Sequence, residues 1–347
     1  MLIDCFEKEH KQGMAPDGQP FRIFTLTNTK GMKVQVMDWG ATWISCQVPV
    51  GKEVREVLLG CQINDYPIQQ VYLGASIGRY ANRIANSRFE LNGKRYLLNA
   101  NQHQHQLHGG KGFHNERWYL EKCGVNSITF SHFSPDGDQG FPGNLHAFVT
   151  YSLSETNNVR IEYEAICDQD CPINLTNHAY FNLNDATFGC DIRGHSLQLN
   201  SDYFLPVDSA GIPNAKLKAV EGTSFDFREE KPIGLDFLQE EQKLVKGYDH
   251  SFLLNLDTEK PCAILTALDR SLRMQVLTSQ PALQIYTGNF LSATPTRQNG
   301  QYADYAGIAL ETQCLPDTPN HPEWWKYGGI TKVGEKYSHK TEYQFIR

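Results

Sequence analysis

The sequence predicts an all-β protein: a large antiparallel β-sandwich with few short helices. Apolar and polar residues alternate with a period of two in segments spread over the chain, most clearly at residues 159–165, which read VRIEYEA. Strand and helix patterns do not alternate in the way that a parallel βαβ sheet requires. The 28 glycines and 16 prolines are spread evenly, as many turns between many strands require. These observations favour a single sandwich domain over residues 1–347.

The expected elements follow in chain order. Strands with one buried and one solvent-exposed face are expected at residues 32–36, 147–153, 159–165, 197–199 and 272–276. Asn92-Gly93 separates residues 88–91 from 94–98 and tolerates the positive φ angles of a type I′ turn, so these residues should form a hairpin. A short helix is expected at residues 235–245, and a further helical turn or two around residues 64–71. Residues 134–144 (SPDGDQGFPGN) form the most conspicuous loop.

Composition excludes some classes of partner. The chain has 32 Lys and Arg against 39 Asp and Glu, a formal charge of −7, so no basic field is available for nucleic acid. Charged residues make up 20% and aromatic residues 11%, a mixture that favours a neutral polar ligand such as a sugar. No window approaches 18 uninterrupted apolar residues, so no membrane-spanning segment is expected. The nine scattered cysteines and the N-terminal MLIDCFEKEH, which lacks signal-peptide character, predict a cytoplasmic protein with free thiols.

A histidine-rich stretch at residues 101–110 (NQHQHQLHGG) is the first candidate for chemistry. On a strand, His103 and His105 would share a face while His108 would point the other way, and no carboxylate or cysteine is near enough to complete a metal site. We therefore expect no metal, with His103 and His105 in a loop. His108 precedes Gly109-Gly110, where the missing side chains leave the imidazole open to a ligand.

Residues 174–183 (NLTNHAYFNL) crowd amides, His178 and two aromatic side chains into one segment. Burying so many polar groups is costly unless a polar ligand meets some of them, although a buried polar strand in which His178 satisfies a backbone carbonyl is the alternative. Asn82 and Arg83 are adjacent multi-donor groups that suit carboxylates or vicinal hydroxyls; a salt bridge to a core carboxylate is the alternative for Arg83.

Glu311 follows the apolar triplet Ile-Ala-Leu, so its carboxylate is expected to lie within a buried strand or at its end. Desolvation there would raise its pKa and make it a candidate base, the alternative being a Glu paired to an Arg. Asp249 and Gln284 are weaker signals by themselves. Phosphate-binding loops and Gly-x-Ser-x-Gly are absent from the sequence, Cys167 and Cys171 have no second cysteine pair, and a glycosidase with two carboxylates from distant strands stays open.

Taken together, these segments resemble the galactose mutarotase (aldose 1-epimerase) family over most of the chain. The motifs that carry the resemblance occur in one order: MDWGAT at 37–42, GRYANRIANSRF at 78–89, LHGG at 107–110, DGDQGFPGN at 136–144, NLTNHAYFNL at 174–183, KGYDH at 246–250, QIYTGNF at 284–290, LETQ at 310–313 and PDTPNHP at 316–322. The segment EWWKYGG at 323–329 departs from the family's pattern, which leaves the rim of the cleft undetermined there.

The resemblance implies a β-sandwich with a sugar in an open cleft. It implies His178 as general acid and Glu311 as general base, with Asn82, Arg83, His108, Asp249 and Gln284 holding the sugar and Tyr180 as a further member of the cleft. The reaction would interconvert the α and β anomers of free aldohexoses such as galactose and glucose, within galactose metabolism, without a cofactor or metal. We expect Glu311 to start ionised and His178 to be kept partly protonated by nearby negative charge.

Two other activities remain at this point: a 1-epimerase for hexose 6-phosphates, which would need a basic cluster, and a non-catalytic sugar-binding protein, against which the presence of both His178 and Glu311 argues. The sequence does not determine the preferred hexose, or whether the protein is a monomer or a homodimer.

Overall fold

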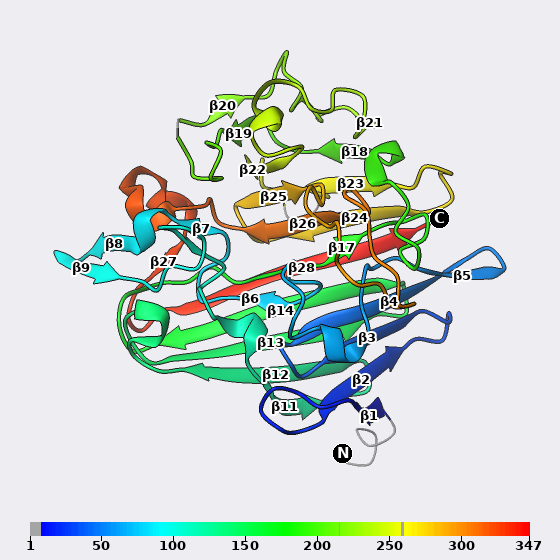
Figure 1. Ribbon diagram of the computed structural model, residues 1–347, viewed down its shortest axis with the longest axis horizontal. Coiled ribbons are helices and arrows are strands. Elements are labelled where there is room, and N and C mark those ends of the chain that lie inside the picture. Colours follow the sequence, from blue (N-terminus) through cyan, green and yellow to red (C-terminus); the bar gives the residue numbers. More distant parts are fainter. Residues whose placement is uncertain (1–7, 215, 258–259) are drawn as a thin grey trace.

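Three large antiparallel sheets and four short strand pairs make up the computed structural model, which describes residues 8–214, 216–257 and 260–347 (Figure 1). The largest has nine strands, in the order β11 (Tyr119–Cys123), β12 (Ser127–Ser134), β13 (Leu145–Leu153), β14 (Asn158–Cys167), β28 (Lys336–Ile346), β24 (Arg273–Thr278), β23 (Ala263–Thr266), β18 (Ser196–Leu199) and β21 (Lys231–Pro232). The five-stranded sheet follows chain order: β1 (Glu9–Gln12), β2 (Phe21–Thr27), β3 (Lys33–Met37), β4 (Thr42–Val50) and β5 (Glu53–Glu56).

A six-stranded sheet lies above the middle of the nine-stranded sheet in the view of Figure 1. Its order is β17 (Tyr180–Phe181), β26 (Ile308–Gln313), β25 (Ala282–Tyr286), β22 (Asp249–Leu253), β19 (Tyr203–Leu205) and β20 (Lys218–Ala219). Short pairs complete the strands: β6 (Ser76–Ile77) with β16 (Thr176–Asn177), β7 (Arg83–Ile84) with β10 (Gln106–Leu107), β8 (Arg88–Leu91) with β9 (Lys94–Leu97), and β15 (Cys171–Pro172) with β27 (Ile330–Thr331).

The sheets are joined by a continuous apolar core. Phe24 of β2 contacts Phe130 of β12 with ring centroids 5.5 Å apart, which packs the five-stranded sheet on the nine-stranded one. Trp43 of β4 contacts both Tyr343 of β28 and Phe181 of β17, at 5.4 and 5.9 Å between centroids. One buried indole therefore touches all three sheets, and its burial contributes on the order of 3 kcal/mol or more.

The predicted β-sandwich class is confirmed. Each predicted alternating segment falls on a strand: residues 32–36 on β3, 147–153 on β13, 159–165 on β14, 197–199 on β18 and 272–276 on β24. The predicted hairpin is β8 and β9, with φ of 54° at Asn92 and 74° at Gly93, as a type I′ turn requires. Residues 134–144 connect β12 to β13 and contain the short 3-10 helix η4 (Asp138–Gly140).

The helix predicted at residues 235–245 is wrong in length and type. The structure has turns followed by the 3-10 helix η6 (Glu240–Leu244). Leu238 has a φ of 57°, which is incompatible with an α-helix, and Gln242 is fully buried, with its side chain hydrogen-bonded to Leu238 and to the backbone of Asp236. Local polar contacts therefore replace the helical ladder.

The other helical pieces are also short 3-10 helices: η1 (Ile63–Asp65), at the position of the turn expected around residues 64–71, η2 (Ala85–Ser87), η3 (Phe113–Asn115), η5 (Ile192–Gly194), η7 (Thr318–Asn320) and η8 (Pro322–Tyr327). Within the described ranges, no helix has the length and apolar character needed to cross a membrane. The eight cysteines of those ranges are unpaired thiols, and Cys5 lies outside them.

Candidate active site

Adjacent strands of the six-stranded sheet form one wall of a cavity. Glu311 on β26 is paired in register with Gln284 on β25, and Tyr286 on β25 is paired with Asp249 on β22. Register partners, and residues two apart on one strand, point to the same face of a sheet. Tyr180 on β17 joins the same row, because its partner Ala309 is also the partner of Tyr286. The pleat alone therefore brings carboxylates, an amide and tyrosines to one face.

The opposite wall comes from the turn before β7 and the turn after β10. Asn82 and His108 are joined in both directions: the His108 backbone N–H donates to the Asn82 carbonyl at 3.0 Å, and the Asn82 N–H donates to His108 Nδ1 at 3.2 Å. A Cβ at the next residue, Gly109, would lie 2.2 Å from the Gly78 carbonyl oxygen, and its φ is +72°. Glycine is therefore required directly beside His108.

The cavity between these walls has a volume of about 350 Å³. It is lined by Gln70, Val71, Tyr72, Asn82, Arg83, Gln102, Leu107, His108, His178, Tyr180, Asp249, Tyr286, Phe290 and Glu311. Seven of the eight site residues expected from the sequence lie in this set, from segments more than 200 residues apart. Within it, the described side chains offer amide, imidazole, carboxylate and guanidinium groups beside four aromatic rings, a combination suited to a polar ligand with an apolar face.

Gln284 is the exception, because it is not among the lining residues. Its side chain is 2% exposed, and its Nε2 donates to Asp249 Oδ1 at 2.7 Å. The family resemblance predicts that Gln284 holds the sugar, which stays a prediction; in the structure its amide group donates to the carboxylate that lines the cavity. The alternation of the strand explains the close approach: Gln284 is opposite Ser251, two residues along β22 from Asp249.

His178 and Glu311 form a buried pair. The His178 Nε2 atom lies 3.6 Å from Glu311 Oε1, and the two residues are 4% and 2% exposed. His178 lies between β16 and β17, held by hydrogen bonds from its N–H to the Ala75 carbonyl and from the Gly74 N–H to its own carbonyl. Among the described groups, His178 Nδ1 and Glu311 Oε2 have no hydrogen-bond partner. Buried polar atoms of this kind are costly unless a ligand meets them.

Burial sets the protonation of the pair. It raises the pKa of Glu311 well above its usual value, with the charge of Asp249 adding to the effect. It also lowers the pKa of His178 to about 4. Burial therefore favours the neutral form of both groups, a protonated Glu311 and an uncharged His178, whereas the expectation was an ionised Glu311 and a partly protonated His178. The reason is that desolvation disfavours both charged forms, and the negative charge near His178 does not offset it.

Arg83 is held from several sides. Its Nε donates to Gln102 Oε1 at 2.8 Å, and its NH2 lies 3.8 Å from Asp249 Oδ2. A Cβ at Gly211 would lie 2.5 Å from the Arg83 Cζ atom, so a backbone without a side chain packs against the guanidinium. Arg83 and Asp249 thus form a positioned ion pair at the cavity rather than a solvated surface pair.

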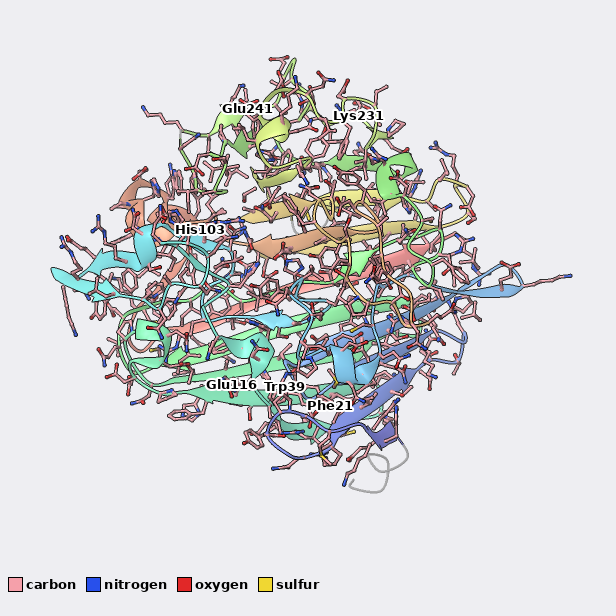
Figure 2. All side chains as sticks on the ribbon, in the orientation of Figure 1. Phe21, Trp39, His103, Glu116, Lys231 and Glu241 are labelled. Carbon is pink, nitrogen blue, oxygen red and sulfur yellow. The ribbon has the colours of Figure 1, made fainter. Side chains whose placement is uncertain are left out.

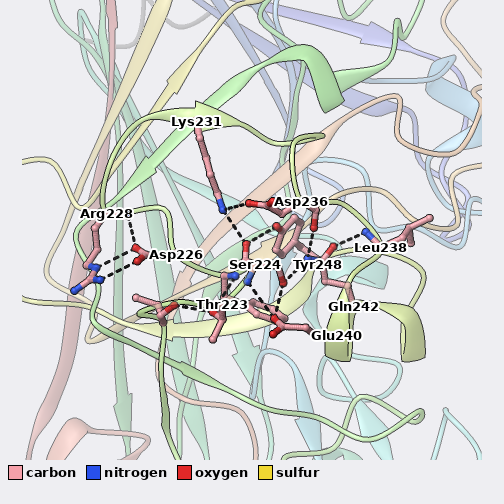
Figure 3. Close-up of polar contacts among 12 residues, drawn as sticks. Thr223, Ser224, Asp226, Arg228, Lys231, Asp236, Leu238, Glu240, Gln242 and Tyr248 are labelled. Carbon is pink, nitrogen blue, oxygen red and sulfur yellow. Dashed lines mark hydrogen bonds and ion pairs between the residues drawn. The ribbon is translucent and has the colours of Figure 1, made fainter.

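A polar network around the buried residues Ser224, Gln242 and Tyr248 anchors the chain just before Asp249 (Figure 3). The Tyr248 hydroxyl donates to the Ser224 carbonyl at 2.8 Å, and Gln242 Nε2 donates to Ser224 Oγ at 2.9 Å. Glu240 accepts from both the N–H and the hydroxyl of Ser224. The segment that was expected to be a helix thereby fixes the start of β22, and with it the position of Asp249.

Several lining residues were missed by the sequence analysis. Tyr286 and Phe290 lie in the quoted motif QIYTGNF, and Leu107 in LHGG, so their motifs were found but their roles were not. Tyr72 and Gln102 sit in irregular segments where no periodicity indicates which way a side chain points. Gln102 belongs to the histidine-rich stretch, in which His103 and His105 lie outside regular strands, as expected of a loop; His103, labelled in Figure 2, is exposed and His105 is buried.

One donor set at the site has the composition of a transition-metal site. Ligand atoms of His108, His178 and Glu311 all lie within 4.8 Å of one another. However, His108 Nδ1 accepts a hydrogen bond from the Asn82 N–H, so the neutral ring carries its proton on Nε2. A metal on Nε2 would require that proton to move to Nδ1, facing the Asn82 N–H. The hydrogen bonds of this site therefore favour His108 as a donor to a ligand oxygen.

Comparison with known proteins identifies the family. The sequence profile described as aldose 1-epimerase matches residues 22–344. The chain is 60% identical over 331 residues to a protein named aldose 1-epimerase from Haemophilus influenzae, covering 95% of this chain and 97% of that one. The chain belongs to the aldose 1-epimerase family.

More distant relatives show the same similarity over most of the chain. This chain is 38% identical over 319 residues to a protein named galactose mutarotase from Homo sapiens, covering 90% of this chain and 91% of that one. The crystal structure of a galactose 1-epimerase from Lactobacillus acidophilus superposes with a TM-score of 0.83 at 30% identity, covering 97% of this chain and 98% of that chain.

The segment of this aldose 1-epimerase family member that departs from the family's pattern lies outside the candidate site. Trp324 lines a second groove of about 560 Å³ together with Lys216, Leu217 and Tyr327. Neither Trp324 nor its neighbour Trp325 lines the cavity of His178 and Glu311.

Proposed function

We propose that this aldose 1-epimerase interconverts the α and β anomers of free aldohexoses, with galactose and glucose as first candidates, by acid and base catalysis at His178 and Glu311. The observation that carries the proposal is the buried His178–Glu311 pair, 3.6 Å apart, in a cavity whose remaining polar groups suit sugar hydroxyls. Ring opening needs a proton removed from the C1 hydroxyl and one delivered to the ring oxygen, so two groups that exchange protons with the sugar suffice.

In each step the pair takes one proton from the sugar and gives one back, so it holds a single exchangeable proton throughout. When a bound pyranose opens, Glu311 takes the C1 hydroxyl proton and His178 gives its own proton to the ring oxygen. The pair then holds a protonated Glu311 and a neutral His178, which is the state that burial favours. Rotation about the C1–C2 bond turns the aldehyde, and the reverse transfers close the ring on either face. Opening requires the proton on His178, and a C1 hydroxyl that donates to Glu311 stabilises that arrangement.

The other lining groups hold the sugar during this exchange. Asp249 can accept from two neighbouring hydroxyls, Arg83 and the Nε2–H of His108 can donate to sugar oxygens, and Asn82 offers both functions. The rings of Tyr72, Tyr180, Tyr286 and Phe290 provide apolar surface for the C–H face of a pyranose. A sugar whose hydroxyl configuration differs leaves a buried group unpaired, which is the source of discrimination among hexoses.

The charge of the cavity argues against a hexose 6-phosphate. Arg83 is the one cation among the described lining residues, and it already contacts Gln102 and Asp249. Phosphate sites usually add lysines or several arginines. A purely binding role is disfavoured because a binding protein has no need for a proton-exchanging pair with perturbed pKa values.

Polarimetry on freshly dissolved α-D-galactose, α-D-glucose and their 6-phosphates tests the proposal. We expect acceleration for the free sugars, weak acceleration for the phosphates, and losses of about 10²–10⁴-fold in Glu311→Gln and in His178→Asn. His103→Asn, at an exposed turn, is the control and should keep the wild-type rate. A folded Glu311→Gln protein with a near-wild-type rate would contradict the assignment, and galactose binding without acceleration by the wild type would indicate a binding protein.

A further inference from the structure

Tyr72 is tied to the backbone of the proposed acid. It begins a turn in which its carbonyl accepts from the Ala75 N–H at 3.0 Å. The same turn holds His178 from both sides: the Gly74 N–H donates to the His178 carbonyl at 3.0 Å, and the His178 N–H donates to the Ala75 carbonyl at 2.9 Å. A shift of this turn would therefore move His178.

The ring of Tyr72 contacts three histidines. Its centroid lies 4.6 Å from that of His108, 4.8 Å from that of His114 and 5.7 Å from that of His178. The contacts with His108 and His114 are edge to face, at 65° and 78°, and the His178 ring is tilted by 30°. Tyr72 also lines the cavity. One aromatic ring thus lies against the proposed acid and against a proposed sugar donor.

The backbone of Tyr72 is unusual for a bulky residue. Its φ is 59°, in the left-handed region that large side chains rarely adopt. Such conformations persist where the surroundings enforce them, and they concentrate at functional sites. Glycine or asparagine would meet the needs of the turn more easily, so the ring itself is the better explanation for a tyrosine here.

We propose that Tyr72 is a positioning residue for the epimerase reaction: its ring orients His178 and His108 and keeps water away from His178. This inference rests on the proposed function, in which His178 exchanges a proton with the sugar. Exclusion of water keeps that proton within the pair. The groups facing His178 from the surrounding elements are Glu311, Asp249, His108, His114, Tyr72, Tyr180 and Tyr286.

Removing the ring should change the titration of His178. Burial lowers the pKa of His178 to about 4, and the Tyr72 ring supplies part of that burial. In Tyr72→Leu, water would reach the imidazole, and the pKa should rise from about 4 toward its usual value of 6.5. Asp249, whose charge raises the pKa of His178, is not altered by the change and therefore favours this rise.

Two substitutions separate the ring from the hydroxyl. Tyr72→Phe keeps the ring, whereas Tyr72→Leu removes it; Tyr119→Leu makes the same change at an exposed position on β11 and serves as the control. We expect kcat of Tyr72→Leu to fall about 10–100-fold, because a misplaced acid affects the chemical step, and KM to rise by a smaller factor, because the ring also lines the cavity and orients His108. Tyr72→Phe should stay within about twofold of the wild type, because the ring contacts are preserved.

The pH profile and an NMR titration of the His178 imidazole nitrogens provide readouts that a merely structural role would not move. We expect the acid limb of kcat/KM, and the His178 titration, to move up by about one pH unit in Tyr72→Leu but not in Tyr72→Phe or Tyr119→Leu. An unchanged limb and titration in Tyr72→Leu would overturn the inference, as would equal losses in Tyr72→Phe and Tyr72→Leu.

Failure of this inference can be told from failure of the proposed function. If Glu311→Gln and His178→Asn are inactive while Tyr72→Leu behaves as wild type, the role of Tyr72 is refuted and the acid and base stand. If Glu311→Gln stays active, the catalytic assignment fails, and the NMR titration still reports whether the ring shields His178.

Discussion

Replacing Gln284 with methionine removes the amide donor that holds Asp249 while keeping a side chain of similar volume. The structure shows one hydrogen bond at stake, from Gln284 Nε2 to Asp249 Oδ1 at 2.7 Å, in a residue that is 2% exposed. Hydrogen bonds to a charged group contribute about 1.5–3 kcal/mol. If the misplaced Asp249 loses that whole free energy from sugar binding, affinity should fall about 10–150-fold, since about 1.4 kcal/mol corresponds to a tenfold change in affinity.

The assay is galactose binding by calorimetry together with the KM and kcat of mutarotation, in a double-mutant cycle with Asp249→Ala, which removes both carboxylate oxygens. If Gln284 acts through Asp249, Gln284→Met should have less than about a twofold effect once residue 249 has no oxygen to accept its hydrogen bond. An undiminished effect of Gln284→Met in the Asp249→Ala background would refute this reasoning, since it would mean that Gln284 contacts the sugar itself.

Three further results are expected. Because burial raises the pKa of Glu311, the native protein holds a proton that the unfolded chain releases above pH 4.5, so its free energy of unfolding falls as pH rises. Glu311→Gln lacks this loss. Urea titrations should therefore show the free energy of unfolding of the variant increasing relative to that of the wild type above pH 4.5 but not below it. Because the pKa of His178 is about 4, wild-type kcat/KM should fall only below about pH 4, and an acid limb near 6.5 would contradict a neutral His178. Arg79 is 2% exposed and donates to the carbonyls of Ser134, Pro135, Pro142 and Gly143. Arg79→Met should therefore lower the free energy of unfolding, measured in urea, by about 3 kcal/mol or more. A loss below about 1 kcal/mol would show that these carbonyls find other partners.

The strands could be predicted from the sequence because apolar and polar side chains alternate every two residues along a half-buried strand. The alternation at residues 159–165 depends on burial of one face, and β14 is buried at those alternate positions in the structure. The turn at Asn92-Gly93 was readable for a local reason, since few residues tolerate positive φ twice in succession. The helix expected at residues 235–245 failed because a buried glutamine and a positive φ at Leu238 overrode the apolar periodicity.

Most residues of the candidate site could be predicted individually from the sequence, but their contacts with one another could not. Unusual polar segments and their resemblance to a known family singled out His178, Glu311, Asn82, Arg83, His108, Tyr180 and Asp249, all of which line one cavity. No pattern along the chain could show that Gln284 contacts Asp249, because that contact depends on the register of β22 against β25. Likewise, the position of Tyr72 against three histidines depends on how an irregular turn packs.

The sequence by itself determined the β-sandwich class, the strand segments and the side chains that offer acid, base and hydroxyl-binding chemistry. Those properties are local: they depend on residue type, on a period of two and on turn residues. The tertiary structure alone decided which of these groups meet, and with what protonation. Desolvation and register arise only when segments from distant parts of the chain pack together, so the raised pKa of Glu311, the lowered pKa of His178 and the contacts of Gln284 and Tyr72 appear only in the folded protein.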